Sequence, residues 1–127
     1  MKKVLLLLLL GFSLMSFIPF QNGREEMITA LKGGEADQFI KYFDNTIDIK
    51  MPNSDEMKGV PKAQAAGTLK SFFTDNSIHQ FDVTSQRELG GTMYITGKLI
   101  GNTDYNLTAM IKSSPDKLSI ITLRINK

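Results

Sequence analysis

The 127-residue sequence has no cysteine and no tryptophan, and His79 is its single histidine. Without cysteine the chain forms no disulfide, thiolate metal site or cysteine nucleophile, and it takes no lipid anchor on an N-terminal cysteine. One imidazole also excludes a metal site built from several histidines of one chain. We therefore expect neither a metal ion nor another cofactor.

An excess of charge is also missing once the first residues are set aside. The sequence has 15 basic and 13 acidic side chains, and removing Lys2 and Lys3 leaves 13 of each. The remaining basic residues are scattered singly. A neutral domain without a basic cluster lacks the electrostatic pattern of a nucleic-acid-binding protein, so we expect no nucleic-acid partner.

Residues 1–20 have the pattern of an export signal. Two lysines precede an unbroken leucine run, Leu5 to Leu10, and a mixed apolar stretch continues to Phe20. We expect cleavage, with the domain of residues 24–127 periplasmic or extracellular. An uncleaved anchor, and with it a membrane-anchored structural subunit, is the alternative, because the apolar stretch is close to the roughly 20 residues that cross a bilayer. A mature N-terminus near Asn22 would exclude that alternative.

Apolar residues at helical spacing predict three helices, over residues 24–32, 35–43 and 61–73. The third begins at Pro61, which suits the first position of a helix. Each helix has an apolar stripe: Met27, Ile28 and Leu31 in the first; Ala36, Phe39, Ile40 and Phe43 in the second; Ala65, Leu69, Phe72 and Phe73 in the third.

Alternation of apolar and polar residues predicts the strands. In residues 46–51, Ile47, Ile49 and Met51 share a face and Asp48 points away from it. A short strand over 56–60 follows. Short turns rich in glycine, asparagine and serine then separate four strands, which predicts an antiparallel meander. These four strands cover residues 78–89, 92–100, 104–112 and 117–126.

The predicted elements favour an α+β domain. The helices are too short to bury their stripes against one another alone. The simplest arrangement packs all three on one face of a curved, mostly antiparallel sheet.

The order of these elements resembles the nuclear-transport-factor-2-like superfamily, also described as SnoaL-like or as a cystatin-like cone. Residues 39–49 resemble its second helix and first strand, and residues 58–63, followed by Phe72-Phe73, resemble its glycine-led third helix. More narrowly, the chain is similar to the exported bacterial family called domain of unknown function 4783. That similarity implies a cone fold and an exported location, but no particular reaction. The superfamily includes isomerases, dehydratases, ligand carriers and dimerisation modules.

A cone of this kind leaves a pocket at its open end, and polar residues in phase with the apolar face are candidates to line it. If the strand 78–89 is regular, His79 and Arg87 point toward the helices, and Arg87 then needs a carboxylate or an anionic ligand. A β-bulge would instead turn Arg87 into solvent. Tyr42, Arg87 and Tyr105 are the candidate ligand-binding residues.

Two residues are candidates for acid–base catalysis. Asp44 stands between the second helix and the first strand, and His79 supplies an imidazole, the side chain that serves most often as a general base. A small isomerase or dehydratase would pair one of them with a tyrosine donor, but no spacing singles out such a pair. We therefore expect a non-catalytic domain with a small, mostly apolar pocket, and keep the enzyme as the alternative.

The last strand suggests a second subunit. Leu118 and Ile120 alternate with a second apolar set, Ile121, Leu123 and Ile125, so the strand is apolar on both faces. A strand of this kind is usually covered on both faces. A homodimer through the outer face of the sheet would provide the cover, while isolated surface apolar residues are the alternative.

Overall fold

The computed structural model describes residues 19–114 and 117–127, with side chains from residue 23 onward. Most of the predicted export signal lies outside these residues. The first described helix, α2 (Pro19–Lys32), begins within the last two positions of that predicted segment. None of the helices in the described part of the chain is long and apolar enough to cross a membrane.

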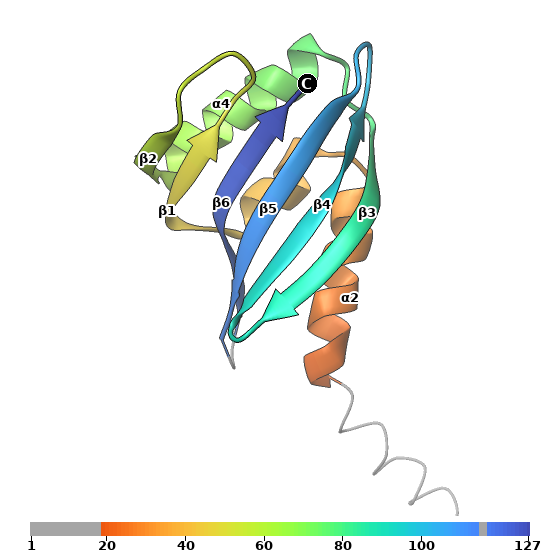
Figure 1. Ribbon diagram of the computed structural model, residues 1–127, viewed down its shortest axis with the longest axis vertical. Helices are drawn as coiled ribbons and strands as arrows, with labels where there is room; N and C mark the ends of the chain where they lie inside the picture. The colour runs from red at the N-terminus through yellow and green to blue at the C-terminus, as the bar shows by residue number, and fades with distance from the viewer. Residues whose placement is uncertain (1–18, 115–116) are drawn as a thin grey trace, which may run out of the picture.

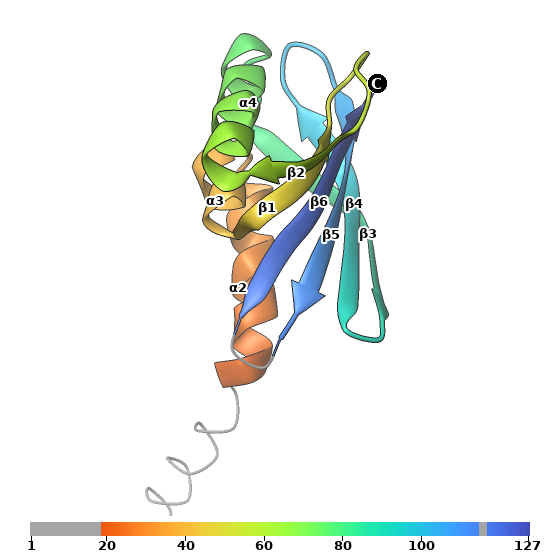
Figure 2. The same cartoon turned by 90° about the vertical axis from the view of Figure 1, so that its left-hand side faces the viewer.

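Three helices lie on one side of a single sheet, as the sequence predicts (Figure 2). After α2 come the short α3 (Ala36–Lys41) and the longer α4 (Lys62–Asp75). The predicted stripe of the third helix is confirmed for Ala65, Leu69 and Phe73 of α4, which are buried, while Phe72 is half-buried. The three described helices therefore all cover the same face of the sheet.

The sheet has six strands in the order β2-β1-β6-β5-β4-β3 (Figure 1). The four-strand meander is confirmed, and every neighbouring pair is antiparallel except β1 and β6, which run parallel. The prediction of an α+β domain with a mostly antiparallel curved sheet is thus confirmed. The strands are β1 (Phe43–Lys50), β2 (Met57–Pro61), β3 (Gln80–Leu89), β4 (Thr92–Ile100), β5 (Tyr105–Ser113) and β6 (Leu118–Asn126).

The second predicted helix is shorter than its apolar stripe. It ends at Lys41, and Phe43 is the first residue of β1 rather than the last residue of a helix. Tyr42 explains this end, because its N–H donates to the Phe39 carbonyl at 3.1 Å while its own carbonyl accepts from the Ile120 N–H at 2.7 Å. The chain is thus already hydrogen-bonded to β6, and Phe43 reaches the core from a strand.

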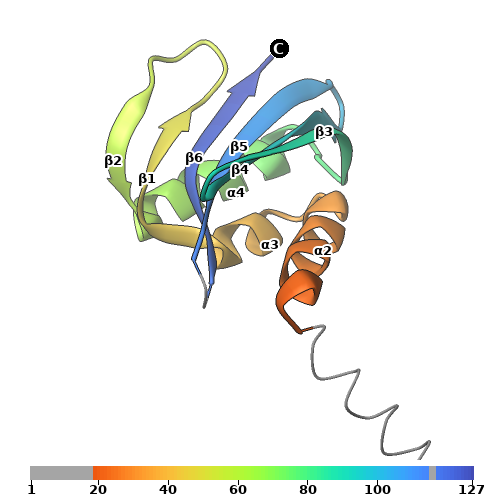
Figure 3. The same cartoon turned by 60° about the horizontal axis from the view of Figure 1, so that its bottom comes forward.

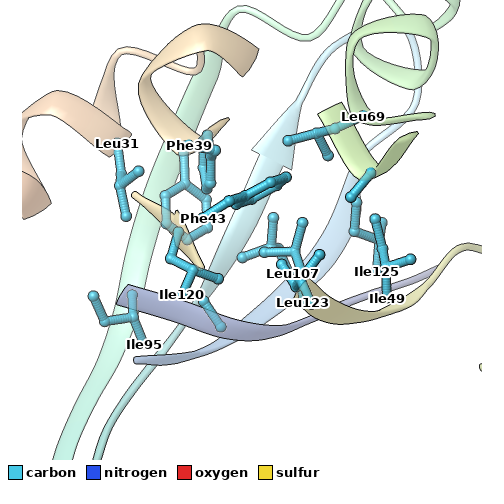
Figure 4. Packing of buried hydrophobic residues seen from close by; sticks show 14 of the residues in the cluster. Leu31, Phe39, Phe43, Ile49, Leu69, Ile95, Leu107, Ile120, Leu123 and Ile125 are labelled. Carbon is cyan, nitrogen blue, oxygen red and sulfur yellow. The ribbon is translucent and has the colours of Figure 1, made fainter. Parts of the chain in front are cut away.

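The core fills the space between the helices and the sheet (Figure 4). Phe39 is fully buried and meets the rings of Phe73 and Phe81 edge-on, with both centroid distances 5.6 Å. From the sheet, Leu123 and Ile125 pack against the same cluster. Apolar side chains of the described residues therefore occupy this interior.

A β-bulge decides the orientation of Arg87. The pairing of β3 with β4 shifts by one residue between Val83 and Ser85. Before the shift Phe81 faces the helices, and after it Gln86 and Glu88 do so. The alternative in which this strand is regular and Arg87 points toward the helices is therefore wrong. Arg87 is exposed on the face of the sheet opposite the helices.

A second bulge corrects the interpretation of the last strand. The pairing of β5 with β6 shifts between Met110 and Ile111, so that Ile121 has no direct partner on β5. Ile120 therefore joins Leu123 in the core, with no exposed surface, instead of facing outward. The alternation of apolar residues in β6 therefore does not produce an apolar outer face. The extra residue, Ile121, places Ile120 and Leu123 on the same side of the sheet.

Gly67 offers a simple test of helix packing on α4. It lies in the helix interior and is exposed, and a Cβ added there meets no atom within 4 Å. Gly67→Ala should therefore raise the free energy of unfolding by about 0.5–1 kcal/mol, because alanine loses less backbone entropy in a helix. Urea denaturation measures this change. An unchanged or lower stability would show that the position is constrained by more than helix propensity.

Candidate functional site

A groove of about 580 Å³ lies between α2 and the strands β3 and β4. Figure 3 shows α2 beneath this edge of the sheet. Two apolar side chains contribute to its wall, the half-buried Ile28 of α2 and the buried Met93 of β4. Charged and polar residues complete the lining: Arg24 and Glu25 from α2, and Gln86, Arg87 and Glu88 from β3.

An ion pair crosses one end of this groove. The Nη1 atom of Arg24 lies 2.5 Å from Oε2 of Glu88, and the Nη2 atom of Arg24 donates to the Ser113 hydroxyl at 3.4 Å. The side chains of Arg24 and Glu88 are 32% and 41% exposed. A pair so accessible to water contributes at most about 1 kcal/mol, so a ligand with a suitable charge can replace either partner at small cost.

Two other grooves are more open to solvent. One of about 670 Å³ lies between α3 and α4, where Asp37 and Lys70 form an ion pair at 3.3 Å. The other, of about 470 Å³, lies beside Lys32 and the first half of β3. In the described residues no group of three histidine, aspartate or glutamate side chains is placed to hold a metal ion.

Asp44 lies at the start of β1, away from these grooves. It is half-exposed, and its Oδ1 accepts a hydrogen bond from the Asn45 N–H at 2.9 Å. It lines none of the three grooves. The carboxylate therefore stabilises the local backbone in this structure.

His79 lies at the opposite edge of the sheet from Asp44, just before β3. Its ring is exposed, with Nδ1 3.1 Å from the Ser77 carbonyl, and it too lines none of the three grooves. Three strands separate β1 from β3. At about 4.8 Å per interval, β1 and β3 lie on the order of 19 Å apart across the sheet, and the register aligns Phe43 with Glu88 at the far end of β3 from His79, so the two candidate residues do not meet.

The candidate tyrosines also lie apart. The Tyr105 hydroxyl donates to Oδ1 of Asn76 at 3.2 Å, and its ring meets that of Phe72 edge-on at 4.9 Å. These contacts tie β5 to the end of α4. Tyr42 ends α3, with the Lys41 ammonium 5.7 Å from its ring centre. Of the five residues singled out from the sequence, only Arg87 borders the groove beside α2.

Sequence reasoning missed the residues that form most of this groove. Ile28 was predicted as part of a core stripe, and Arg24 only as the start of a helix. The relevant signal is their spacing of four residues, which places a cation and an apolar side chain on one face of α2. Their partner Glu88 lies 64 residues from Arg24 and turns toward α2 only because of the bulge in β3.

With this geometry established, the chain can be compared with known proteins. The family model described as "Domain of unknown function (DUF4783)" matches residues 24–126. This chain belongs to that family. A search of curated proteins found no match.

Solved structures agree with the family and the fold. A DUF4783 family protein from Bacteroides ovatus is 25% identical, with a TM-score of 0.70 over 79% of this chain and 90% of that chain. An NTF-2-like protein of unknown function from Shewanella oneidensis is 12% identical, with a TM-score of 0.60 over 82% of this chain and 98% of that chain. A putative ketosteroid isomerase from Parabacteroides distasonis is 14% identical, with a TM-score of 0.51 over 77% and 79%. The DUF4783 chain therefore has the NTF2-like fold.

Proposed function

We propose that this chain is an exported, non-catalytic domain that binds a small, mostly apolar molecule between α2 and the β3–β4 edge. The observation that carries the proposal is the groove that Ile28 and Met93 line with apolar surface and the Arg24–Glu88 pair borders with charge. Its volume of about 580 Å³ is within the usual range of small-molecule sites, about 300–1,000 Å³.

The chemistry of the groove favours an amphiphile over a fully apolar ligand. An apolar body can cover Ile28 and Met93, while a polar group meets Arg24 or Glu88 at the end of the groove. Because that ion pair is partly hydrated, exchanging one partner for a ligand group costs little. Export is supported by the lysine-led leucine run at the start of the sequence.

The alternative enzyme has less support. The putative ketosteroid isomerase from Parabacteroides distasonis shares the fold at 14% identity, and a shared fold does not determine function. A general base must come within about 3 Å of the proton that it removes. Neither Asp44 nor His79 lines any of the three grooves described above.

The binding test uses 1-anilinonaphthalene-8-sulfonate, a fluorescent probe with an apolar ring system and one negative charge. We expect saturable binding of one probe per chain. Ile28→Trp should abolish it by filling the groove, because tryptophan adds a large ring at a half-buried wall position. Thr29→Trp is the matched control, since Thr29 is the exposed next residue of α2 and lines none of the three grooves. Near-ultraviolet circular dichroism checks that both variants keep native packing.

The same titration separates binding from catalysis. Asp44→Asn and His79→Gln should bind the probe as the unmodified chain does, because both residues lie away from the groove. Equal probe binding by Ile28→Trp and the unmodified chain would contradict the assignment of the groove. Turnover of a ketosteroid that Asp44→Asn abolishes would contradict the non-catalytic role and favour the enzyme.

A further inference from the structure

Among the described strands, β3 forms one edge of the sheet and is hydrogen-bonded to β4 alone (Figure 1). Along a strand, the backbone N–H and C=O groups of successive residues point alternately to one side and to the other. Every second residue of β3 therefore bonds to β4, and the residues between them direct their N–H and C=O groups away from the sheet. An unpaired edge of this kind is a template for another extended chain.

A hydrogen bond at the turn between β3 and β4 fixes the alternation. The Ser113 N–H of β5 donates to the Gly91 carbonyl at 2.8 Å, so the backbone of Gly91 faces β5. By alternation Met93 of β4 also faces β5, and the backbones of Thr92 and Tyr94 face β3. The alternation in β4 therefore determines the alternation in β3.

Gln86 and Glu88 are residues of β3 that direct their backbone groups away from the sheet. Tyr94 is paired with Arg87, so the backbone of Arg87 bonds to β4. Its two neighbours, Gln86 and Glu88, therefore point their N–H and C=O groups outward. Within residues 19–114 and 117–127, neither of them forms a backbone hydrogen bond to a helix or a loop. Both residues are exposed, so these donors and acceptors are accessible to a ligand.

The groove beside α2 runs along this part of the edge. Gln86 and Glu88 line it from β3, opposite Ile28 of α2, and the buried Met93 completes its apolar wall. An extended chain that pairs with the outward groups places every second side chain on the helix side, in the groove. The side chain between these two lies on the other face, beside Arg87. Arg87 is exposed and has no ion pair within the described residues.

We propose that the ligand of this groove is a short, extended peptide segment of another protein, which adds to the sheet along the edge of β3. Apolar side chains at two alternate positions enter the groove, and an acidic side chain between them lies opposite Arg87. This ligand class rests on the proposed function, because the peptide uses the same groove. A peptide pairs with the backbone groups of Gln86 and Glu88, which an amphiphile without amide groups leaves unpaired.

The bulge in β3 limits the length of the peptide. The regular pairing after it covers five residues, from Ser85 to Leu89. At about 3.4 Å per residue, this run is roughly 17 Å long and suits a segment of about five residues. A second copy of β3 fits the same run poorly, because antiparallel pairing over its whole length sets Arg87 against the other copy's Arg87. The edge therefore favours a segment with the opposite charge at this position.

A pentapeptide probe, Thr-Val-Glu-Val-Thr with an amidated C-terminus and fluorescein on a Gly-Gly linker, tests the preference by fluorescence anisotropy. We expect saturable binding of one peptide per chain. Lysine in place of the central glutamate of the probe should weaken binding about fivefold, because a like charge then faces Arg87. Arg87→Gln should remove this difference between the two probes. Lys62→Gln is the control, since Lys62 is exposed on α4 and lines none of the three grooves.

Proline tests the backbone pairing, because it has no N–H. At position 86 the N–H points away from β4, so proline keeps the pairing within the sheet. Gln86→Pro should bind the peptide about tenfold more weakly than Gln86→Ala, because both variants lack the glutamine side chain and only proline lacks the N–H. 1-Anilinonaphthalene-8-sulfonate needs no backbone bond and should bind the two variants equally. Near-ultraviolet circular dichroism checks their folding.

Amide hydrogen exchange in the unmodified chain, followed by NMR, needs no variant and decides the question if Gln86→Pro does not fold. In the free chain the amides of Gln86 and Glu88 should exchange faster than that of Arg87, which is bonded to β4. At a peptide concentration of about ten times its Kd, exchange at Gln86 and Glu88 should slow about tenfold, because only the unbound fraction exchanges. 1-Anilinonaphthalene-8-sulfonate should not slow it.

These measurements separate the ligand class from the groove itself. A chain that binds 1-anilinonaphthalene-8-sulfonate but not the peptide would overturn the peptide proposal and leave the groove assignment intact, whereas failure of both would overturn both. Equal peptide binding by Gln86→Pro and Gln86→Ala, or unchanged exchange at Gln86 and Glu88 in the complex, would also overturn the proposal. Slow exchange at these amides in a dimeric free chain would overturn it as well, because a second copy would then occupy the edge.

Discussion

Phe39→Ala is expected to lower the free energy of unfolding by about 3–5 kcal/mol, the usual cost of removing a fully buried phenylalanine. Phe39 has no exposed surface, and it is the ring that joins Phe73 of α4 to Phe81 of β3. Its removal leaves a cavity and ends two edge-to-face contacts at once. The effect should be large because the surrounding elements, two helices and a strand, cannot all move inward together.

Thermal and urea unfolding measure the loss, and a decrease of roughly 10 °C or more in Tm is expected. Phe72→Ala is the matched control, because Phe72 is half-buried and its ring meets that of Tyr105 at the margin of the core. It should cost clearly less than Phe39→Ala. If the two variants lose the same stability, Phe39 is not the central contact between the helices and the sheet.

Gly34→Ala should lower the free energy of unfolding by roughly 3 kcal/mol or more. Gly34 follows α2 with a φ of +66°, which a residue with a Cβ adopts at a cost of about 1–2 kcal/mol. A Cβ at this position would also lie 2.2 Å from the Gln80 backbone nitrogen and 2.6 Å from its Cα. Backbone atoms cannot rotate away as a flexible side chain does, so the α2–α3 turn and the start of β3 must separate.

Gly90→Ala isolates the contribution of this contact. Gly90 has nearly the same φ, +61°, but an added Cβ there meets no atom within 4 Å. It should therefore cost only the conformational term, about 1–2 kcal/mol. Urea denaturation of both variants measures the difference. Equal losses would show that the close approach of Gly34 to β3 is relieved without cost.

The Gly34 contact also connects stability to the candidate site. It fixes the C-terminal end of α2 against the start of β3. The Arg24–Glu88 pair fixes an earlier turn of α2 to the end of β3. The groove lies between these two attachments. Displacement of α2 in Gly34→Ala should therefore weaken probe binding even where the variant remains folded.

The sequence by itself determined the class of the fold and most of its elements. Three apolar stripes at helical spacing and four alternating segments between short turns predicted the helices and the meander, because these patterns depend on neighbouring residues. The absence of cysteine and the single histidine likewise excluded disulfides and histidine-rich metal sites. The predicted face of the first strand is confirmed, since Ile47 and Ile49 are buried while Asp48 lies opposite.

Only the tertiary structure decided how these elements meet. One extra residue in β3 and one in β6 reversed the orientation of everything after it, yet a bulge leaves the local pattern of residue types almost unchanged. The parallel pairing of β1 with β6 joins segments from opposite ends of the domain, and no local pattern encodes it. The groove beside α2 depends on the bulge in β3, which turns Glu88 toward Arg24. Its chemistry therefore became visible only when the strands were in register.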